Sequence, residues 1–303
     1  MEAILKTIKE NQKLSVIILA GFAFIVLFVI SFIIASAAEK LSHAEKQAAN
    51  KQAAAERSTL YYYEVENEER YTAYADANPD IAWDDVVWHV NVQLDKEPYE
   101  DPITIENIDA TPILVNKHYM LPAEFVPKDI VETRDGKPLR KDVYAAYNAM
   151  RDAIHQEKLE LSITSGYRSI QEQDDLYNYY LNQAKGDQAK VDSESSRPGF
   201  SEHHTGATID LIAPNFDMEE FGKSLESEWV DANAHLYGFI VRYTEENKAI
   251  TGYEAEPWHV TYVGVEAATF MKENNILTLE EYYAKYIQHN PAEAEQEATE
   301  EES

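Results

Sequence analysis

The stretch SEHHTGATID, residues 201–210, decides how this chain builds a site. Its imidazole at His203 and its carboxylate at Asp210 lie seven residues apart, with Gly206 between them. Glycine lets the backbone turn sharply, and residues 207–212 have the apolar and β-branched character of a short strand. A histidine in a loop and an aspartate on the strand that follows can therefore converge on one point.

A second segment, EPWHV at residues 256–260, brings His259 to the edge of another predicted strand. Two histidines and a carboxylate supply three ligands and leave a fourth position for water, which is the arrangement of a catalytic zinc site. Zinc would lower the pKa of such a water to about 7, and Glu256 is close enough in sequence to take its proton. The spacing alone leaves a metal site and a structural His/Asp network equally open.

Composition excludes several other classes of site and partner. The 303 residues include no cysteine, so disulfides, thiolate ligands and cysteine nucleophiles are excluded. With 26 Lys and Arg against 55 Asp and Glu, the formal net charge is -29. The phosphates of a nucleic acid would repel such a chain, so we expect no nucleic-acid partner.

The pattern around the two segments predicts an α+β domain. Apolar residues at helical spacing, from Val143 to Ile154, predict a helix over 139–157. Further helices are predicted over 169–185 and 265–274, strands over 159–165, 207–212, 238–243 and 259–263, and a last helix opened by a Thr278–Glu281 capping box. Helices and strands do not alternate as regular βαβ units, which favours the α+β class.

The N-terminal region predicts a membrane anchor. Residues 14–38 form an uncharged run of 25 residues, and about 20 apolar residues suffice to span a bilayer as a helix. The apolar core of a signal peptide is usually only about 7–15 residues long, so an uncleaved anchor is favoured over a cleaved leader. We expect a cytoplasmic tail over 1–13, the transmembrane anchor over 14–38 and a helical stalk over 39–59.

The rest of the chain divides into three further predicted parts. Residues 60–110 are predicted to be a membrane-proximal extension that packs on the main domain, with strand-like alternation over residues 86–92. The main domain is expected over 111–287. Residues 288–303 are rich in Glu and Ala and are predicted to form an acidic disordered tail.

Taken together, the motifs resemble one known family. The pattern Ser-x-His-x-x-Gly-x-x-x-Asp followed by EPWH is similar to that of the VanY-type zinc D-alanyl-D-alanine carboxypeptidases (LAS, or M15B, peptidases). SGYRS at 165–169, LVNK at 114–117 with a following Leu-Pro, and GFIVRY at 238–243 also resemble that family and occur in its order. The resemblance covers roughly residues 111–275. His204 departs from it by replacing an amide, and Thr208 by replacing a small apolar residue.

The resemblance implies one zinc ion per chain, held by His203, Asp210 and His259. It also implies that Glu256 is the general base and later the acid that protonates the leaving amine. His204 could compete for the metal, but the Ser-x-His register favours His203.

The same resemblance assigns residues to the substrate. Arg168 would stabilise the oxyanion or hold the substrate, which suits a fixed cation. Ser201 and Gln173 would contact the substrate. From the residues alone, Ser201 could instead cap a turn and Gln173 could lie exposed on its helix.

The implied fold is the Hedgehog/DD-peptidase-like one, a small antiparallel sheet flanked by helices. The implied reaction removes the terminal D-alanine from peptidoglycan stem peptides, and the same chemistry in an L,D-carboxypeptidase or an endopeptidase stays open. A non-catalytic wall-binding module or a scaffolding membrane protein would belong to another class, but Glu256 and all three ligands are intact. Because the wall lies outside the membrane, we expect a single-pass protein of a bacterial, Gram-positive cell membrane with an extracellular catalytic domain.

Overall fold

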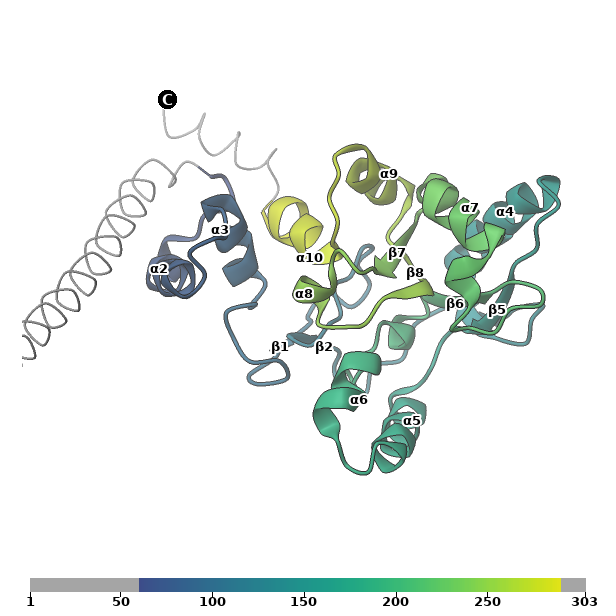
Figure 1. The fold of residues 1–303 in the computed structure, drawn as a ribbon, viewed down its shortest axis with the longest axis horizontal. Coiled ribbons are helices and arrows are strands. Elements are labelled where there is room, and N and C mark those ends of the chain that lie inside the picture. Colours follow the sequence, from purple (N-terminus) through teal and green to yellow (C-terminus); the bar gives the residue numbers. More distant parts are fainter. Residues whose placement is uncertain (1–59, 290–303) are drawn as a thin grey trace, which may run out of the picture.

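The computed structural model describes residues 60–289 (Figure 1). The predicted cytoplasmic tail, anchor and stalk lie outside the described residues, as does the acidic tail from residue 290 onward. Within residues 60–289, no helix has the length and apolar character needed to cross a bilayer.

A four-stranded antiparallel sheet forms the centre of the fold, with the strand order β5–β6–β8–β7. The strands are β5 (Ser162–Ser165), β6 (Thr208–Ile212), β7 (Phe239–Tyr243) and β8 (Glu256–Tyr262). This confirms the predicted small antiparallel sheet. The register pairs Asp210 of β6 with His259 of β8 and with Ser165 of β5. Directly opposed residues lie on the same face of a sheet, so Asp210 and His259 project together.

The other face of the sheet carries the main hydrophobic core. Ile209 and Leu211 flank Asp210 on β6 and point to the opposite face, because successive side chains of a strand alternate. They pack with α4 (Lys141–Gln156) and α7 (Leu225–Asn233), whose apolar stripes bury residues such as Tyr147 and Val230. Figure 1 shows both helices beside β5 and β6. The core therefore fixes β6 from behind and leaves Asp210 free to face the site.

Two helices follow β5 and lie together away from α4 and α7 (Figure 1). These are α5 (Ile170–Gln183) and α6 (Gln188–Glu194). The first begins with a full capping box, in which Ser169 accepts from the Glu172 N–H and the Glu172 carboxylate accepts from the Ser169 backbone. The predictions of helices over residues 139–157 and 169–185 are thus confirmed, to within a few residues at each end.

The N-terminal extension forms helices rather than a strand. It contains η1 (Val65–Asn67), α2 (Glu68–Ala77) and α3 (Trp83–Asn91). The prediction of strand-like alternation over residues 86–92 is therefore wrong. Val86, Val87 and Val90 are all fully buried, and this i, i+1, i+4 spacing matches one face of a helix. The residues that follow, from Trp88 to Val92, alternate apolar and polar side chains as a strand would, but the polar members His89 and Asn91 are buried in the helix.

The extension shares a core with the C-terminal helices. The buried side chains of α3 pack in one cluster with residues of α9 (Val265–Glu273), α10 (Leu279–Tyr282) and the π-helical turn η5 (Tyr283–Ile287). Thr278 caps α10 by accepting from the Glu281 N–H at 3.0 Å. Side chains of α2 and α3 therefore share one core with the C-terminal helices.

Short elements complete the described part of the chain. They are β1 (Ile103–Thr104) paired in parallel with β2 (Tyr119–Met120), the hairpin of β3 (Ile130–Glu132) and β4 (Pro138–Arg140), η2 (Glu202–Thr205), η3 (Phe221–Lys223), η4 (Ala234–Tyr237) and α8 (Lys248–Thr251). The strand predicted over 259–263 begins earlier, at Glu256, and that predicted over 159–165 begins later, at Ser162.

Candidate active site

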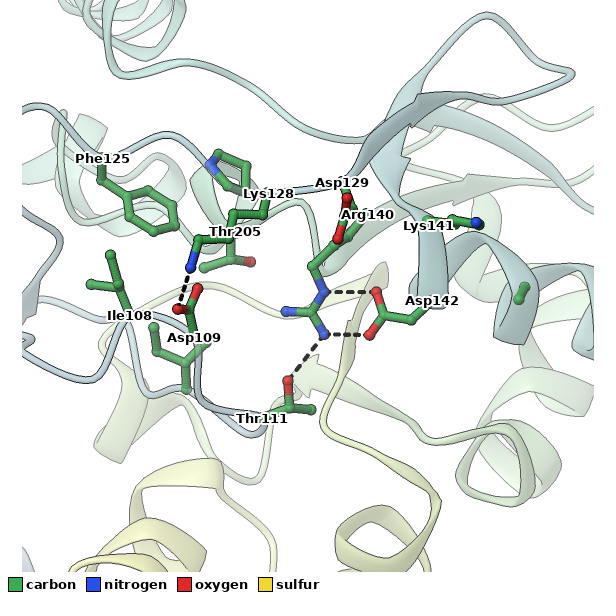
Figure 2. Close-up of a pocket in the computed structure, with 13 residues that line it drawn as sticks. Ile108, Asp109, Thr111, Phe125, Lys128, Asp129, Arg140, Lys141, Asp142 and Thr205 are labelled. Atoms are coloured by element: carbon green, nitrogen blue, oxygen red, sulfur yellow. Dashed lines mark hydrogen bonds and ion pairs between the residues drawn. The ribbon is translucent and has the colours of Figure 1, made fainter.

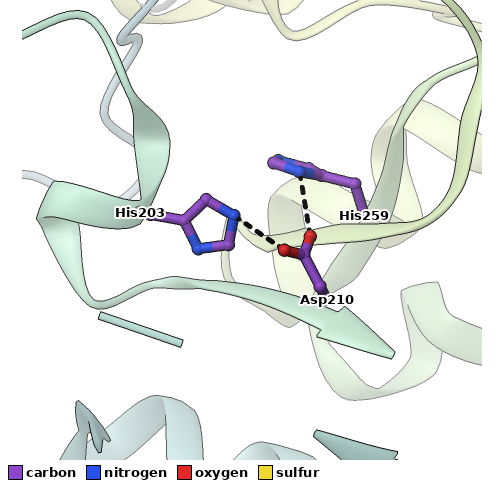
Figure 3. A group of neighbouring side chains, drawn as sticks. All are labelled: His203, Asp210 and His259. Atoms are coloured by element: carbon purple, nitrogen blue, oxygen red, sulfur yellow. Dashed lines mark ion pairs between the residues drawn. The ribbon is translucent and has the colours of Figure 1, made fainter. Parts of the chain in front are cut away.

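Three side chains predicted as metal ligands converge beside strands β6 and β8 (Figure 3). Asp210 and His259 are brought together by strand register, and His203 reaches them from the short helix η2. The turn between η2 and β6 depends on Gly206, whose φ is +66°. A Cβ at that position would lie 2.7 Å from Ile130 Cδ1, so the turn admits no side chain.

The geometry of this group fits a metal ion. His203 Nε2 lies 3.2 Å from Asp210 Oδ2, and His259 Nδ1 lies 3.3 Å from Asp210 Oδ1. One ligand atom from each residue falls within 4.8 Å of the other two. Although His259 Nδ1 is 3.3 Å away, the buried Asp210 Oδ1 lacks a hydrogen bond of good geometry, an arrangement that a cation would satisfy. Nitrogen and oxygen donors of this kind suit zinc.

Electrostatics also prepare the group for a cation. Burial alone would raise the pKa of Asp210, but the charge of His203 and hydrogen bonds from both histidines lower it well below the usual carboxyl range. Burial would lower the pKa of His259, but hydrogen bonds to Asp210, Glu202 and Glu256 raise it well above its ordinary value. The carboxylates therefore concentrate negative charge around His259, which favours a cation at this point.

Each histidine is held by a partner on its other ring nitrogen. His203 Nδ1 lies 2.7 Å from the Gly166 carbonyl oxygen, and His259 Nε2 lies 3.4 Å from Glu202 Oε2. Because both partners can only accept, each of these nitrogens donates, so His203 Nε2 and His259 Nδ1 are the nitrogens that would offer a lone pair to a metal ion. Such outer hydrogen bonds fix the tautomer and orientation of metal-binding histidines.

Glu202 contacts the metal group although the sequence pattern did not single it out within the quoted motif. Its carboxylate accepts from Arg242 Nε at 2.6 Å and from Thr261 Oγ1 at 2.5 Å, besides facing His259. Burial opposes ionisation, but Arg242 and the hydrogen bonds from His259 and Thr261 lower its pKa to about 2. Arg242 is itself fully buried and forms a two-point pair with Glu280. A buried ionic network therefore stands directly behind His259.

Glu256 lies at the start of β8 beside the metal group. Its Oε2 is 3.3 Å from His259 Nδ1, and the side chain remains partly open to the cavity. Glu256 therefore lies within reach of the point that His203, Asp210 and His259 face.

Arg168 faces the same cavity from the loop after β5. Its guanidinium donates from Nη1 to Gln173 Oε1 at 2.6 Å and from Nη2 to Ser165 Oγ at 2.9 Å. Gln173 is buried rather than exposed, and its amide donates to the Ser196 carbonyl oxygen at 2.7 Å. Ser201 caps η2 by accepting from the His203 N–H at 3.3 Å, and it also lines the cavity. Capping a turn and facing the substrate cavity are therefore compatible at this position.

His204 turns away from the metal group. Its Nε2 accepts from the Gly199 N–H at 3.1 Å, so its Nδ1 donates to the Arg168 carbonyl oxygen at 2.7 Å. Burial lowers its pKa to about 4 and keeps it neutral near pH 7. His204 thus joins the loop that carries Arg168 to the segment that carries His203, and this contact could not be read from the sequence.

All seven predicted site residues line one cavity of about 460 Å³. The cavity wall also includes aromatic side chains that the sequence did not place against substrate, namely Tyr180, Tyr243, Tyr253 and Trp258. The Tyr243 ring lies 4.8 Å from the His259 ring. Aromatic residues gave no signal in the sequence because the chain contains 20 tyrosines spread along its length.

A second hollow of about 520 Å³ lies elsewhere (Figure 2). Four of its charged side chains pair with one another, since Arg140 pairs with both carboxylate oxygens of Asp142 and Lys128 pairs with Asp109. Thr205 also lines this hollow and belongs to η2, the short helix that carries His203. The predicted chemistry belongs to the first cavity.

Comparisons with known proteins place the chain in a family. Residues 136–265 match the VanY family, described as D-alanyl-D-alanine carboxypeptidase. The putative carboxypeptidase YodJ of Bacillus subtilis is 39% identical over 194 residues, which cover 60% of this chain and 70% of YodJ. The D-alanyl-D-alanine carboxypeptidase of Enterococcus faecium is 33% identical over 199 residues, covering 60% of this chain and 61% of that protein.

Solved structures agree with the sequence matches. The LD-carboxypeptidase LdcB is 37% identical with a TM-score of 0.57, covering 61% of this chain and 91% of LdcB. A VanY variant solved in complex with Zn(II) is 29% identical with a TM-score of 0.51, covering 57% of this chain and 98% of that structure. With its fold, its His/Asp/His group and these matches, the chain belongs to the VanY family of D-alanyl-D-alanine carboxypeptidases and is a zinc-dependent carboxypeptidase.

Proposed function

We propose that His203, Asp210 and His259 bind one zinc ion and that the chain removes the terminal D-alanine from peptidoglycan stem peptides ending in D-Ala-D-Ala. The observation that carries this proposal is the meeting of three buried ligand groups with Glu256 and Arg168 around one cavity. A non-catalytic wall-binding module would have no use for a carboxylate placed 3.3 Å from a ligand histidine.

The residues of the cavity have distinct tasks in this reaction. Zinc held there would act as a Lewis acid toward the scissile carbonyl and would acidify the attacking water. The Glu256 carboxylate takes the proton of that water and returns it to the leaving amine. The Arg168 guanidinium, a fixed cation, balances the negative charge that develops on the carbonyl oxygen or holds the C-terminal carboxylate of the substrate.

Residues behind the cavity hold these groups in place. The Gly166 carbonyl and the Glu202 carboxylate orient the two histidines, and the buried pair of Arg242 with Glu202 keeps that carboxylate ionised. His204 fixes the distance between the Arg168 loop and the His203 segment through its two backbone contacts. Ser201 and Gln173 would contact the bound peptide from the same wall as Arg168.

The tetrapeptide stem is a second candidate substrate and should be compared with the pentapeptide, because the LD-carboxypeptidase LdcB is 37% identical to this chain. An L,D-carboxypeptidase would act on a tetrapeptide stem, from which one D-alanine has already gone. The full chain should be incubated with stem pentapeptide and tetrapeptide separately, and the products followed by mass spectrometry. Loss of one D-alanine from the pentapeptide supports the proposal, whereas turnover of the tetrapeptide alone supports the L,D alternative. Cleavage inside the stem would identify an endopeptidase.

The proposed setting is the outer face of a bacterial cell membrane. It rests on the uncharged run at residues 14–38, on the stalk predicted over 39–59, and on the location of peptidoglycan outside the bilayer. Residues 60–287 would then lie outside the cell. Full-length protein in a bacterial host should sediment with membranes and be digested when protease is added to intact protoplasts. Recovery in the soluble fraction, or protection from protease, would contradict this setting.

A further inference from the structure

Tyr99 lies in the extension, upstream of residues 136–265 that match the family, and adopts a strained backbone. Its φ is +67°, a region that large side chains rarely enter. The conformation is held by its N–H, which donates to the Lys117 carbonyl oxygen at 2.8 Å. Backbone strain persists where the surrounding structure enforces it, often beside functional sites, so the contacts of this side chain are informative.

The Tyr99 ring packs against the back of one wall of the active-site cavity. The Arg197 guanidinium carbon lies 4.1 Å from the ring centroid, and the Phe200 ring meets it edge-on at 5.0 Å. These two residues are the immediate neighbours of Ser196 and Ser201, which both line the cavity. A ring from the extension therefore packs against residues 196–201 and holds this segment in position.

The Tyr99 hydroxyl also enters a series of contacts that ends at Arg168. It lies 3.3 Å from the hydroxyl of Tyr253, which in turn lies 2.9 Å from Ser196 Oγ. The Ser196 carbonyl accepts from the Gln173 amide, and the Gln173 carbonyl accepts from Arg168. Each member of this series after Tyr99 lines the cavity.

We propose that Tyr99 is a positioning residue for substrate binding, through which the extension sets the wall formed by residues 196–201 and, beyond it, the guanidinium of Arg168. This inference rests on the proposed carboxypeptidase function. The contacts of Tyr99 described above run to the substrate wall and not to His203, Asp210 or His259. We therefore expect the metal group to form without Tyr99. The effect of losing Tyr99 should therefore appear in peptide binding and not in zinc binding.

The test compares full-length zinc-loaded variants on a stem pentapeptide ending in D-Ala-D-Ala. Tyr99→Phe removes the hydroxyl alone, and Tyr99→Leu also removes the aromatic ring. The matched control is Tyr74→Phe, which removes another hydroxyl of the extension, bonded to His89 and remote from the cavity. For each variant, KM, kcat, zinc affinity and the unfolding midpoint are measured.

We expect KM to rise about 3-fold for Tyr99→Phe and about 10-fold for Tyr99→Leu, since a hydrogen bond and a cation–π contact are each modest. The kcat and zinc affinity should stay within about 2-fold, and Tyr74→Phe should leave all kinetic constants unchanged. Unaltered KM in both Tyr99 variants would overturn the inference, as would equal changes in Tyr74→Phe.

A double-mutant comparison keeps the test decisive if Tyr99→Leu fails to fold. In a Tyr253→Phe background the series of hydroxyl contacts is already broken, so adding Tyr99→Phe should raise KM less than it does in the wild type. If the two substitutions raise KM independently of each other, the contacts of Tyr99 with Tyr253 and Ser196 do not act as one series. If the wild-type chain turns over no pentapeptide, the proposed function itself fails. If the wild type is active but the Tyr99 variants have the same KM, only the inference about Tyr99 fails.

Discussion

The two sides of the active-site cavity are built differently. On the metal side, Asp210 and His259 sit opposite each other on neighbouring strands, and all three ligands are buried. On the substrate side, Arg168 and Gln173 come from a loop and a helix start and are tied by side-chain contacts to a distant segment. Backbone pairing of β6 with β8 fixes two of the three residues of the metal group, whereas the substrate wall depends on side-chain contacts between a loop, a helix and the segment before η2.

The largest effect should come from the residue that stands between the two sides. Glu256→Gln keeps the size of the side chain but cannot accept a proton, so hydrolysis should fall by about 10²–10⁴-fold. Zinc content should stay unchanged, because Glu256 is not among the three converging ligands. Steady-state kinetics and elemental analysis on the same sample provide the check. Retained activity in a zinc-loaded variant would remove Glu256 from its proposed role.

The buried network behind His259 should control zinc affinity more than substrate affinity. Glu202→Gln replaces the carboxylate that faces His259 Nε2 and pairs with Arg242. Loss of such an outer contact typically weakens metal binding about 10–100-fold. Competition with a chromophoric chelator measures the zinc affinity, and KM at saturating zinc should change little. Equal zinc affinity in the two proteins would show that the network serves folding alone.

Gly166 links the two sides, and a methyl group there should disturb both. A Cβ at this position would lie 2.4 Å from the Pro138 carbonyl oxygen, too close for any real contact. Gly166→Ala should therefore lower the free energy of unfolding by about 1–3 kcal/mol and shift the carbonyl that orients His203. Denaturant unfolding and zinc competition report the two effects. An alanine variant with unchanged stability and unchanged zinc affinity would contradict this account of the loop.

The smallest effect belongs to the helix that carries Gln173. Ser169→Ala removes the N-cap of α5 and should cost about 1 kcal/mol of unfolding free energy. In the same capping box, hydrogen bonds from the Ser169 hydroxyl and N–H hold the pKa of Glu172 below its ordinary value of 4.5. Because the folded-state pKa is depressed, this stabilisation is present above pH 4.5 and is lost as the pH falls below it.

Unfolding of the wild type and of Glu172→Gln should accordingly differ in pH dependence. The wild type should lose more stability than the variant between about pH 7 and the acid side of 4.5. Parallel curves would mean that the capping carboxylate contributes nothing in its charged form.

The same comparison explains what could be predicted from the sequence. The metal group is easier to predict because its residues are few and chemically distinctive, and the resemblance of their motifs to a known family points to His203, Asp210, His259 and Glu256 where spacing alone leaves the choice open. The helix α4 is predictable from one apolar stripe. In contrast, α3 ends in a short run, residues 88–92, that alternates apolar and polar side chains, so the same residues fit a strand as well as a helix.

Contacts between separate elements could not be predicted from the sequence, for a different reason. Nothing in the sequence indicates that His204 bridges Gly199 to Arg168, that Glu202 faces His259, or that Tyr99 approaches Tyr253. Each contact depends on how separate elements pack, and histidine, glutamate and tyrosine occur at many other positions in the chain. The cavity wall is therefore less predictable than the metal group it faces.

The most direct test of the central claim is a zinc titration of the chelated full-length protein, with release of D-alanine from the pentapeptide as the signal. The account predicts that metal-free protein is inactive, that activity is restored in full at one zinc per chain, and that His259→Ala neither retains zinc nor regains activity under the same conditions. Hydrolysis by the metal-free protein, or full recovery in the His259 variant, would contradict the assignment of this group as the catalytic zinc site.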